Sequence, residues 1–391
     1  MWGLERNGLR AVALLFFAAT AAAQESGIQL GTWVLYPSAG ASIGYDDNVA
    51  LTSSDEIDSL YLLFSPAVRL EKDTRRSRIQ VEYRAEYADY LDSSEDNYLD
   101  QLLGGLWQYD PTVRSDLEVS AELSRGHDRR GEGLREGSGT VLEREVDEYD
   151  NIQFGGRYGY GANGARGRIE AFADWNETEY TNNRDFTTRG DFDQWRYGVE
   201  FQYRIGGRTV ALAQVVQSDI NYRSANRDSE ERAYGLGISW QASERTRGKA
   251  VVGRLQRDFD DPVLPGFKGA FWEVSASWTP VSRSEFGLLT RRATDESFGA
   301  SGFVLREETE LSWRYNWRPR LLTSVDFGWM DEDFQPGPRD DDVVSFSVSA
   351  DYQFRPWLLL GAGFRKVERE SSLPEFNYDR SEFLLTVEMS P

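Results

Sequence analysis

The single histidine of the chain is the first residue whose chemistry must be weighed. His127 precedes Asp128 and lies among Arg125, Arg129 and Arg130. A serine hydrolase needs a nucleophile, a histidine base and an acidic residue held rigidly together. Nothing in the sequence marks a nucleophile for His127, so a solvated loop histidine is the favoured interpretation. We expect no enzyme activity, and a hydrolase remains the minor alternative.

Acidic clusters and a glycine-rich stretch are the other features that could bind a ligand. The clusters lie at residues 331–333 and 340–342, but they lack the ligand spacing of a calcium loop. The glycines at residues 155–161 precede no predicted helix, which a dinucleotide-binding turn requires. The sequence therefore predicts no catalytic residue, no metal site and no cofactor.

The overall charge excludes another class of partner. The formal net charge is -21, whereas a nucleic-acid-binding protein needs a basic footprint. The chain contains no cysteine, so its stability cannot depend on disulfides. It contains 12 Trp and 19 Tyr, residues that collect at membrane–water interfaces.

The N-terminal residues have the order of a secretory signal peptide. Arg6 and Arg10 precede an apolar run at residues 11–23 that ends in three alanines, which is typical of a cleavage site. The run is too short to cross a bilayer as a helix, which takes about 20 apolar residues. We expect residues 1–23 to be a signal peptide and residues 24–35 to be a short periplasmic segment.

Alternation of apolar and polar residues dominates the rest of the chain. At residues 195–205, Trp195 and every second residue after it are apolar, while Arg196, Glu200 and Arg204 lie on the opposite face. A period of two indicates β-strands rather than helices. The alternating runs are about ten residues long, which suits a tilted membrane strand.

Eighteen such segments can be counted, with sixteen as the alternative because the three segments centred near residues 104, 213 and 288 alternate poorly. The connections that lead from an odd-numbered to an even-numbered segment are mostly long and acidic, as at residues 127–150. Those that lead from an even-numbered to an odd-numbered segment are short, as at Gly206-Gly207. Long loops on one side and tight turns on the other are typical of a transmembrane barrel. The predicted fold is all-β, a transmembrane antiparallel up-and-down β-barrel over residues 36–391.

The polar face of the strands is expected to line the lumen. A barrel of sixteen to eighteen strands is wide enough to hold water, and the mixture of acids and arginines favours cross-strand pairs over strong ion selectivity. The candidate lumen-facing residues are Glu82, Arg84, Glu86, Arg196, Glu200, Arg204, Glu310, Arg314 and Asp351.

The stretch at residues 36–49 carries a family resemblance. Its last part, Tyr45, Asp46, Asp47, Asn48 and Val49, resembles the end of the first strand in the putative β-barrel porin 2 family. The resemblance extends over essentially the whole mature chain and implies a barrel in the cell outer membrane. The resemblance implies no catalytic or ligand-binding residue. We expect residues 45–49 to have a structural role, closing the first strand into its outer loop.

The expected function follows from the wide barrel and the resemblance. The protein is expected to be a porin-like channel or a component of exopolysaccharide export, because family members are often associated with exopolysaccharide systems. The alternative is a non-conducting structural or surface-interaction barrel whose lumen is plugged by residues 129–149.

The expected partners follow from the outer-membrane location. They are outer-membrane lipid, lipopolysaccharide, the barrel-assembly machinery and polysaccharide-export components, with no nucleic acid. The last strand, at residues 383–389, is followed by Ser390 and Pro391 in place of the terminal aromatic residue common in such barrels. This departure is expected to affect insertion efficiency and not the fold.

Overall fold

A computed structural model describes residues 27–136, 145–162, 164–297 and 302–390. The predicted signal peptide at residues 1–23 lies outside the described residues. All the long strands belong to one sheet, in which every neighbouring pair is antiparallel and β19 pairs with β2 to close the sheet into a barrel. Closure leaves no strand edge exposed to lipid, where an unpaired backbone group would be costly.

Eighteen strands form the wall of the barrel. They are β2 (Trp33–Asp46), β3 (Ser59–Asp73), β4 (Ser77–Tyr90), β5 (Tyr98–Thr112), β6 (Ser115–Asp128), β7 (Asp147–Tyr160), β8 (Gly167–Tyr180), β9 (Phe192–Gly206), β10 (Thr209–Tyr222), β11 (Ser229–Ser243), β12 (Thr246–Phe259), β13 (Phe267–Val281), β14 (Ser284–Glu296), β15 (Phe303–Arg318), β16 (Leu321–Gln335), β17 (Asp340–Arg355), β18 (Leu358–Ser371) and β19 (Tyr378–Met389).

The strand count of eighteen is confirmed, and the alternative of sixteen is wrong. Each strand contains 12 to 16 residues, more than the ten or so that the alternating runs suggested. The extra residues lie mainly toward the end that carries the long loops, where the strands continue beyond the apolar band. Strands of this length are long enough to cross the membrane as a tilted sheet.

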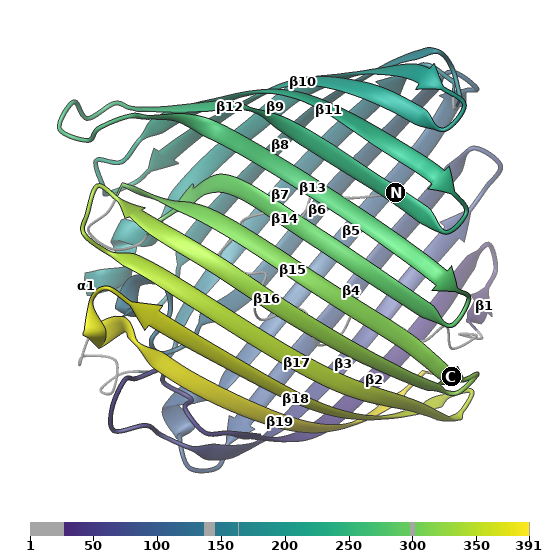
Figure 1. The fold of residues 1–391 in the computed structure, drawn as a ribbon. Helices are drawn as coiled ribbons and strands as arrows, with labels where there is room; N and C mark the ends of the chain where they lie inside the picture. Colours follow the sequence, from purple (N-terminus) through teal and green to yellow (C-terminus); the bar gives the residue numbers. More distant parts are fainter. Residues whose placement is uncertain (1–26, 137–144, 163, 298–301, 391) are drawn as a thin grey trace.

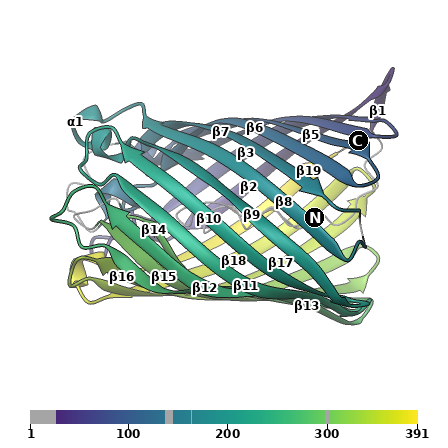
Figure 2. The ribbon, with the colours of Figure 1, turned by 90° about the horizontal axis from the view of Figure 1, so that it is seen from above.

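The links between strands separate into two groups, as the long-and-short pattern predicted. Short turns gather at one end of the barrel, together with the three-residue strand β1 (Ile28–Leu30), at the right of Figures 1 and 2. The longer loops and the one-turn helix α1 (Arg184–Thr187) gather at the opposite end. We call the short-turn end the inner rim and the long-loop end the outer mouth. No helix in the described residues is long and apolar enough to span a membrane.

The chain enters the barrel through a small hairpin. β1 folds back on the start of β2, with Ile28 opposite Leu35, across a turn in which Gly31 has φ +66°. β2 begins at Trp33, three residues before the expected start of the barrel at residue 36. The segment expected to be a periplasmic lead-in therefore includes β1 and the first residues of the wall.

Candidate functional site

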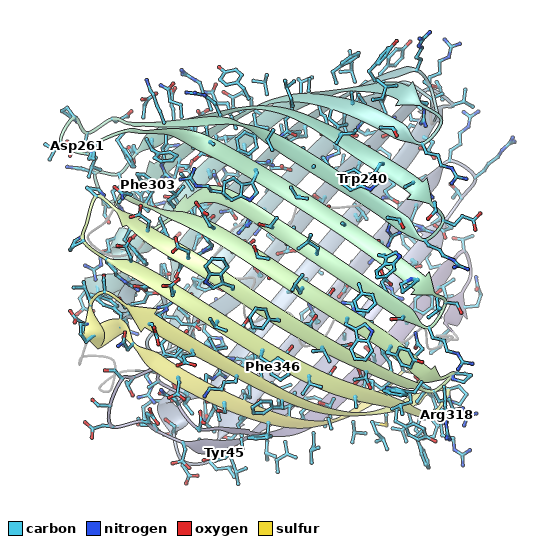
Figure 3. The ribbon with its side chains drawn as sticks, viewed as in Figure 1. Tyr45, Trp240, Asp261, Phe303, Arg318 and Phe346 are labelled. Atoms are coloured by element: carbon cyan, nitrogen blue, oxygen red, sulfur yellow. The ribbon has the colours of Figure 1, made fainter. Side chains whose placement is uncertain are left out.

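The two faces of the wall differ in chemistry, and the strand register keeps them apart. On β9 the outward residues Trp195, Val199 and Phe201 are 45–49% exposed to the surroundings of the barrel. Figure 3 shows Phe346 on the outer surface of β17, and Trp240 on that of β11 toward the inner rim. Opposite residues of paired strands share a face. Each residue on the inner face is thus aligned with inner-face residues of the neighbouring strands.

The predicted residues on β4 and β9 line internal cavities. Glu82 and Arg84 line a cavity of about 190 Å³ against β5, β6 and β7, and their charged atoms are 4.0 Å apart. Arg196 and Glu200 line a larger cavity of about 410 Å³. Glu86 lies nearer the outer mouth and accepts a hydrogen bond of 2.7 Å from the hydroxyl of Tyr98.

The remaining predicted residues lie on separate parts of the inner face. The Arg204 guanidinium is close to the inner rim, where it donates to the carbonyls of Ala165 and Gly207. On β15, Glu310 lies opposite Gly328 and Arg314 opposite Ser324. Asp351 on β17 lies opposite Leu322 and Gly361. The predicted set therefore shares one face of the sheet without forming a single cluster.

Ion pairs between neighbouring residues run along the inner face. Arg168 on β8 contacts Asp116 on β6 at 2.7 Å, Lys249 on β12 contacts Glu200 at 3.2 Å, and Arg157 on β7 contacts Glu170 at 3.5 Å. Arg196 is 3.7 Å from Asp174. Pairing of this kind neutralises charge locally, so the wall offers polar contacts of both signs and no single-sign field.

A loop crosses the outer mouth above the larger cavity. This third outer loop, residues 129–146, connects β6 and β7 and is described up to Glu136 and again from Glu145. Arg130 is 2% exposed and donates to Asp96 and Ser93 of the loop between β4 and β5. Arg135 contacts Asp147 at 2.5 Å. Both ends of the described part are therefore fixed to neighbouring elements.

The first described part of this loop ends at Glu136, which contacts residues on the other side of the mouth. Glu136 is 2.8 Å from Arg339, in the loop between β16 and β17, and 3.2 Å from Arg369 on β18. In the closed sheet, β18 is separated from β6 by β19 and by β2 to β5. Contact between Glu136 and Arg369 thus spans a large part of the opening.

Glu136 contacts a network of buried charged residues. Arg306 on β15 contacts Glu332 at 2.5 Å, Arg339 contacts Asp341 at 2.5 Å, and Arg369 lies 3.5 Å from Glu332. Burial lowers the pKa of Arg339, but its hydrogen bond to Asp341 and the nearby carboxylate of Glu136 outweigh burial and raise that pKa above its ordinary value. Arg339 therefore stays charged and holds the loop electrostatically. No single motif in the sequence marks this network, because its members come from four separate segments.

The outer part of the β14–β15 hairpin also occupies the mouth. The pairing of β13 with β14 extends outward only to Trp272 and Arg292, so β14 leaves its neighbour beyond that point. Phe303 is 2% exposed and packs on Phe259 and Phe267. Together with the third outer loop, this hairpin narrows the entrance to the lumen.

The motif at residues 45–49 lies where the barrel closes on itself. Asp46 is 2.6 Å from Arg380 on β19, and Asp47 accepts a hydrogen bond of 2.6 Å from the backbone N–H of Ser381. Asn48 donates to the carbonyls of Thr52 and Asp379 at 2.8 and 2.9 Å.

The ends of the motif attach it to its surroundings. The Tyr45 hydroxyl donates to Asp58 at 3.1 Å. Val49 is 3% exposed and packs in a cluster with Tyr61, Tyr90 and Tyr98. The motif thus joins β2, its outer loop and β19 in one arrangement.

His127 lies in the wall and not in a loop. It is in β6, its Nδ1 is 2.9 Å from Asp100 on β5, and its ring stacks on Tyr98 with centroids 3.8 Å apart. These contacts hold the ring but bring no nucleophilic hydroxyl or thiol to it. Within the described ranges, no group of three metal-binding side chains comes together either.

Solved structures share this fold at low sequence identity. OccK2 (OpdF) of Pseudomonas aeruginosa, in complex with glucuronate, aligns with a TM-score of 0.51 and 12% identity over 91% of this chain and 98% of that chain. OpdK of the same organism, with vanillate, gives a TM-score of 0.52 and 11% identity over 91% and 99%. A BenF-like porin from Pseudomonas fluorescens Pf-5 gives 0.51 and 9% over 93% and 100%. No curated protein matches the chain in sequence.

The family model agrees with the architecture. The model described as Putative beta-barrel porin 2 matches residues 21–390, which is nearly the whole chain. Its match confirms the resemblance based on residues 36–49, and the closed eighteen-strand barrel places the protein in the cell outer membrane. The chain belongs to the Putative beta-barrel porin 2 family.

Proposed function

We propose that this barrel is a non-enzymatic channel for small hydrophilic solutes, with its entrance narrowed by the third outer loop and the β14–β15 hairpin. The observation that carries the proposal is the cavity of about 410 Å³ beneath these elements, whose lining combines Arg196, Glu200, Lys249 and Glu273 with polar residues of β7 to β14. A wall that presents both charges can replace the hydration of a polar solute as it passes.

The width of the barrel supports this reading. A sheet of sixteen to eighteen strands encloses an aqueous lumen, and the inner face is lined by ion pairs that water can reach. Glucuronate and vanillate, the small carboxylates bound to two structures of the same fold, are reasonable first solutes. Saccharide passage, which the association with exopolysaccharide systems implies, is the finer form of the proposal, with export components as its partners.

Single-channel recording in planar bilayers tests the channel. The purified barrel should open steps of constant conductance, and removal of residues 131–145 should increase the step size because the loop no longer crosses the mouth. A folded barrel that conducts neither with nor without this loop would contradict the proposal. Liposome swelling with monosaccharides and with oligosaccharides of increasing length then measures which solutes pass.

A plugged, non-conducting barrel is the second candidate. It is favoured by the anchoring of the third outer loop on both sides, through Arg130 at one end and Glu136 at the other. In that case the intact protein gives no conductance and the loop deletion alone opens a pore. The same two recordings therefore distinguish the candidates.

A further inference from the structure

An arginine repeats at the inner rim. At seven of the eight turns that join an odd-numbered strand to the next even-numbered strand, the residue immediately before the even strand is arginine. At the eighth turn this residue is Trp357. The seven residues, here called the rim arginines, are Arg76, Arg114, Arg166, Arg208, Arg245, Arg283 and Arg320.

The backbone places the rim arginines in equivalent positions. The carbonyl of each accepts a hydrogen bond of 2.7 to 2.9 Å from a backbone N–H close to the end of the next odd-numbered strand. The donor lies two residues before that end in six cases, as Asn316 does for Arg283, and directly after it in the seventh, as Gly161 does for Arg114. The same bond recurs at every turn of the ring. The arginines consequently lie at one level, at seven of the eight turns of the inner rim. The inner rim is the end of the barrel at the right of Figure 1.

The charges of the rim arginines are exposed and uncompensated. All seven residues are exposed, and their hydrogen bonds go to uncharged acceptors, such as the carbonyl of Pro111 for Arg76 and that of Pro280 for Arg245. Across residues 27–136, 145–162, 164–297 and 302–390, none of the seven forms an ion pair, although 20 other arginines do. In a chain of net charge -21, seven unpaired cations at one end are a strong asymmetry.

The rim arginines follow directly after a belt of lipid-facing aromatic residues. Trp278 and Trp317 are each 52% exposed on the outer face, and Trp240 is half-buried on the same face. They precede Arg283, Arg320 and Arg245 by five, three and five residues. Aromatic belts mark the membrane–water interface of a barrel. The guanidiniums are therefore at the depth of the lipid headgroups.

We propose that the rim arginines bind the phosphate groups of anionic phospholipids in the membrane leaflet that faces the short turns. A guanidinium donates parallel hydrogen bonds to phosphate oxygens as well as opposing their charge. A series of arginines at seven of the eight turns matches a layer of many small anionic ligands. A protein partner would instead contact one side of the rim, where no comparable cluster is concentrated.

Lipid selectivity measured by tryptophan quenching tests the proposal. The protein is placed in vesicles of phosphatidylcholine containing brominated phosphatidylglycerol or brominated phosphatidylcholine, and quenching of the lipid-facing tryptophans gives the relative affinity for the two lipids. We expect about a fivefold preference for phosphatidylglycerol at low salt. This preference should fall toward one in 1 M salt, where the Debye length is about 3 Å.

Three triple variants test whether the charge of the rim arginines causes the lipid preference. The triple substitution Arg114→Gln, Arg283→Gln and Arg320→Gln should lose most of the preference, and the corresponding lysine substitutions should keep it. The matched control Arg125→Gln, Arg189→Gln and Arg223→Gln removes three charges at the outer mouth and should behave like the original protein. All are compared as folded barrels, identified by the heat-dependent shift of their mobility in SDS gels.

Several results would overturn the proposal. Equal affinity for the two lipids in the original protein is one, and an unchanged preference in the rim glutamine variant is another. A rim variant that keeps its lipid preference but no longer sediments with isolated cell-wall peptidoglycan would assign the ring to the cell wall instead.

Discussion

At the scale of single residues, Asn48 organises the junction between the first and last strands. Its side chain is fully buried and uses both the amide nitrogen and the amide oxygen, bonding Thr52 on its own loop and the carbonyl of Asp379 on β19. Its backbone N–H also donates to Asp46 at 3.1 Å. One residue thus connects segments 331 positions apart in the chain.

Replacing Asn48 with alanine should destabilise the barrel. The substitution removes three part-buried hydrogen bonds to backbone groups of Thr52 and Asp379, which costs about 1–3 kcal/mol in the free energy of unfolding. Urea unfolding in lipid vesicles, followed by tryptophan fluorescence, measures the change. Tyr45→Phe is the control, since it removes only the exposed hydrogen bond to Asp58 and should cost less than about 1 kcal/mol. Equal effects of both substitutions would contradict this role of Asn48.

At the scale of elements, the third outer loop depends on Glu136 for its attachment across the mouth. Neutralising this carboxylate by Glu136→Gln leaves Arg339 and Arg369 with one fewer counter-charge. The loop should then spend more time away from the mouth and the mean single-channel conductance should rise. Glu95→Gln, at an exposed position in the preceding outer loop, removes the same charge and should leave conductance unchanged. A larger effect of Glu95→Gln would refute the attachment.

At Gly253 on β12, the backbones of β11 and β12 lie too close together for a side chain. A Cβ atom there would lie 1.9 Å from the carbonyl oxygen of Tyr234 on β11, so the two backbones would have to separate. Gly253→Ala should therefore destabilise the barrel by about 1–3 kcal/mol, as measured by urea unfolding. Gly207→Ala, in a turn where nothing lies within 4 Å of the added carbon, should change stability by no more than about 0.5 kcal/mol.

Two of the segments that alternated poorly show why sequence patterns weaken near the mouth. Toward the outer end of β10, the inward residues Ile220 and Tyr222 are apolar and pack with Phe192 under the loops, while the outward residues Asp219 and Asn221 are polar. Beyond the lipid the solvent lies outside the barrel, so the usual polarity of the faces is reversed. On β14 the alternation fails because the strand leaves the wall.

At the scale of the whole molecule, the outward face of the barrel must match hydrocarbon. Phe346 lies near the middle of β17, is 40% exposed and points outward (Figure 3). Phe346→Arg places a charge near the middle of the membrane and should cost about 2–4 kcal/mol, measured by unfolding from lipid vesicles. Ser349→Arg, on the lumen face of the same strand, should cost much less, and comparable losses would contradict the assignment of faces.

The sequence by itself determined the barrel, a strand count of eighteen or sixteen, and the side on which the long loops lie. These features depend on local alternation and turn residues, because a one-residue shift would turn every charged side chain toward lipid. Only the tertiary structure decided what fills the outer mouth. The network of Glu136, Arg306, Glu332, Arg339 and Arg369 joins segments far apart in the chain, and no local pattern records which buried arginine meets which carboxylate. Closure of the barrel supplies that information, because it brings β18 and the loop after β6 to opposite sides of the same opening.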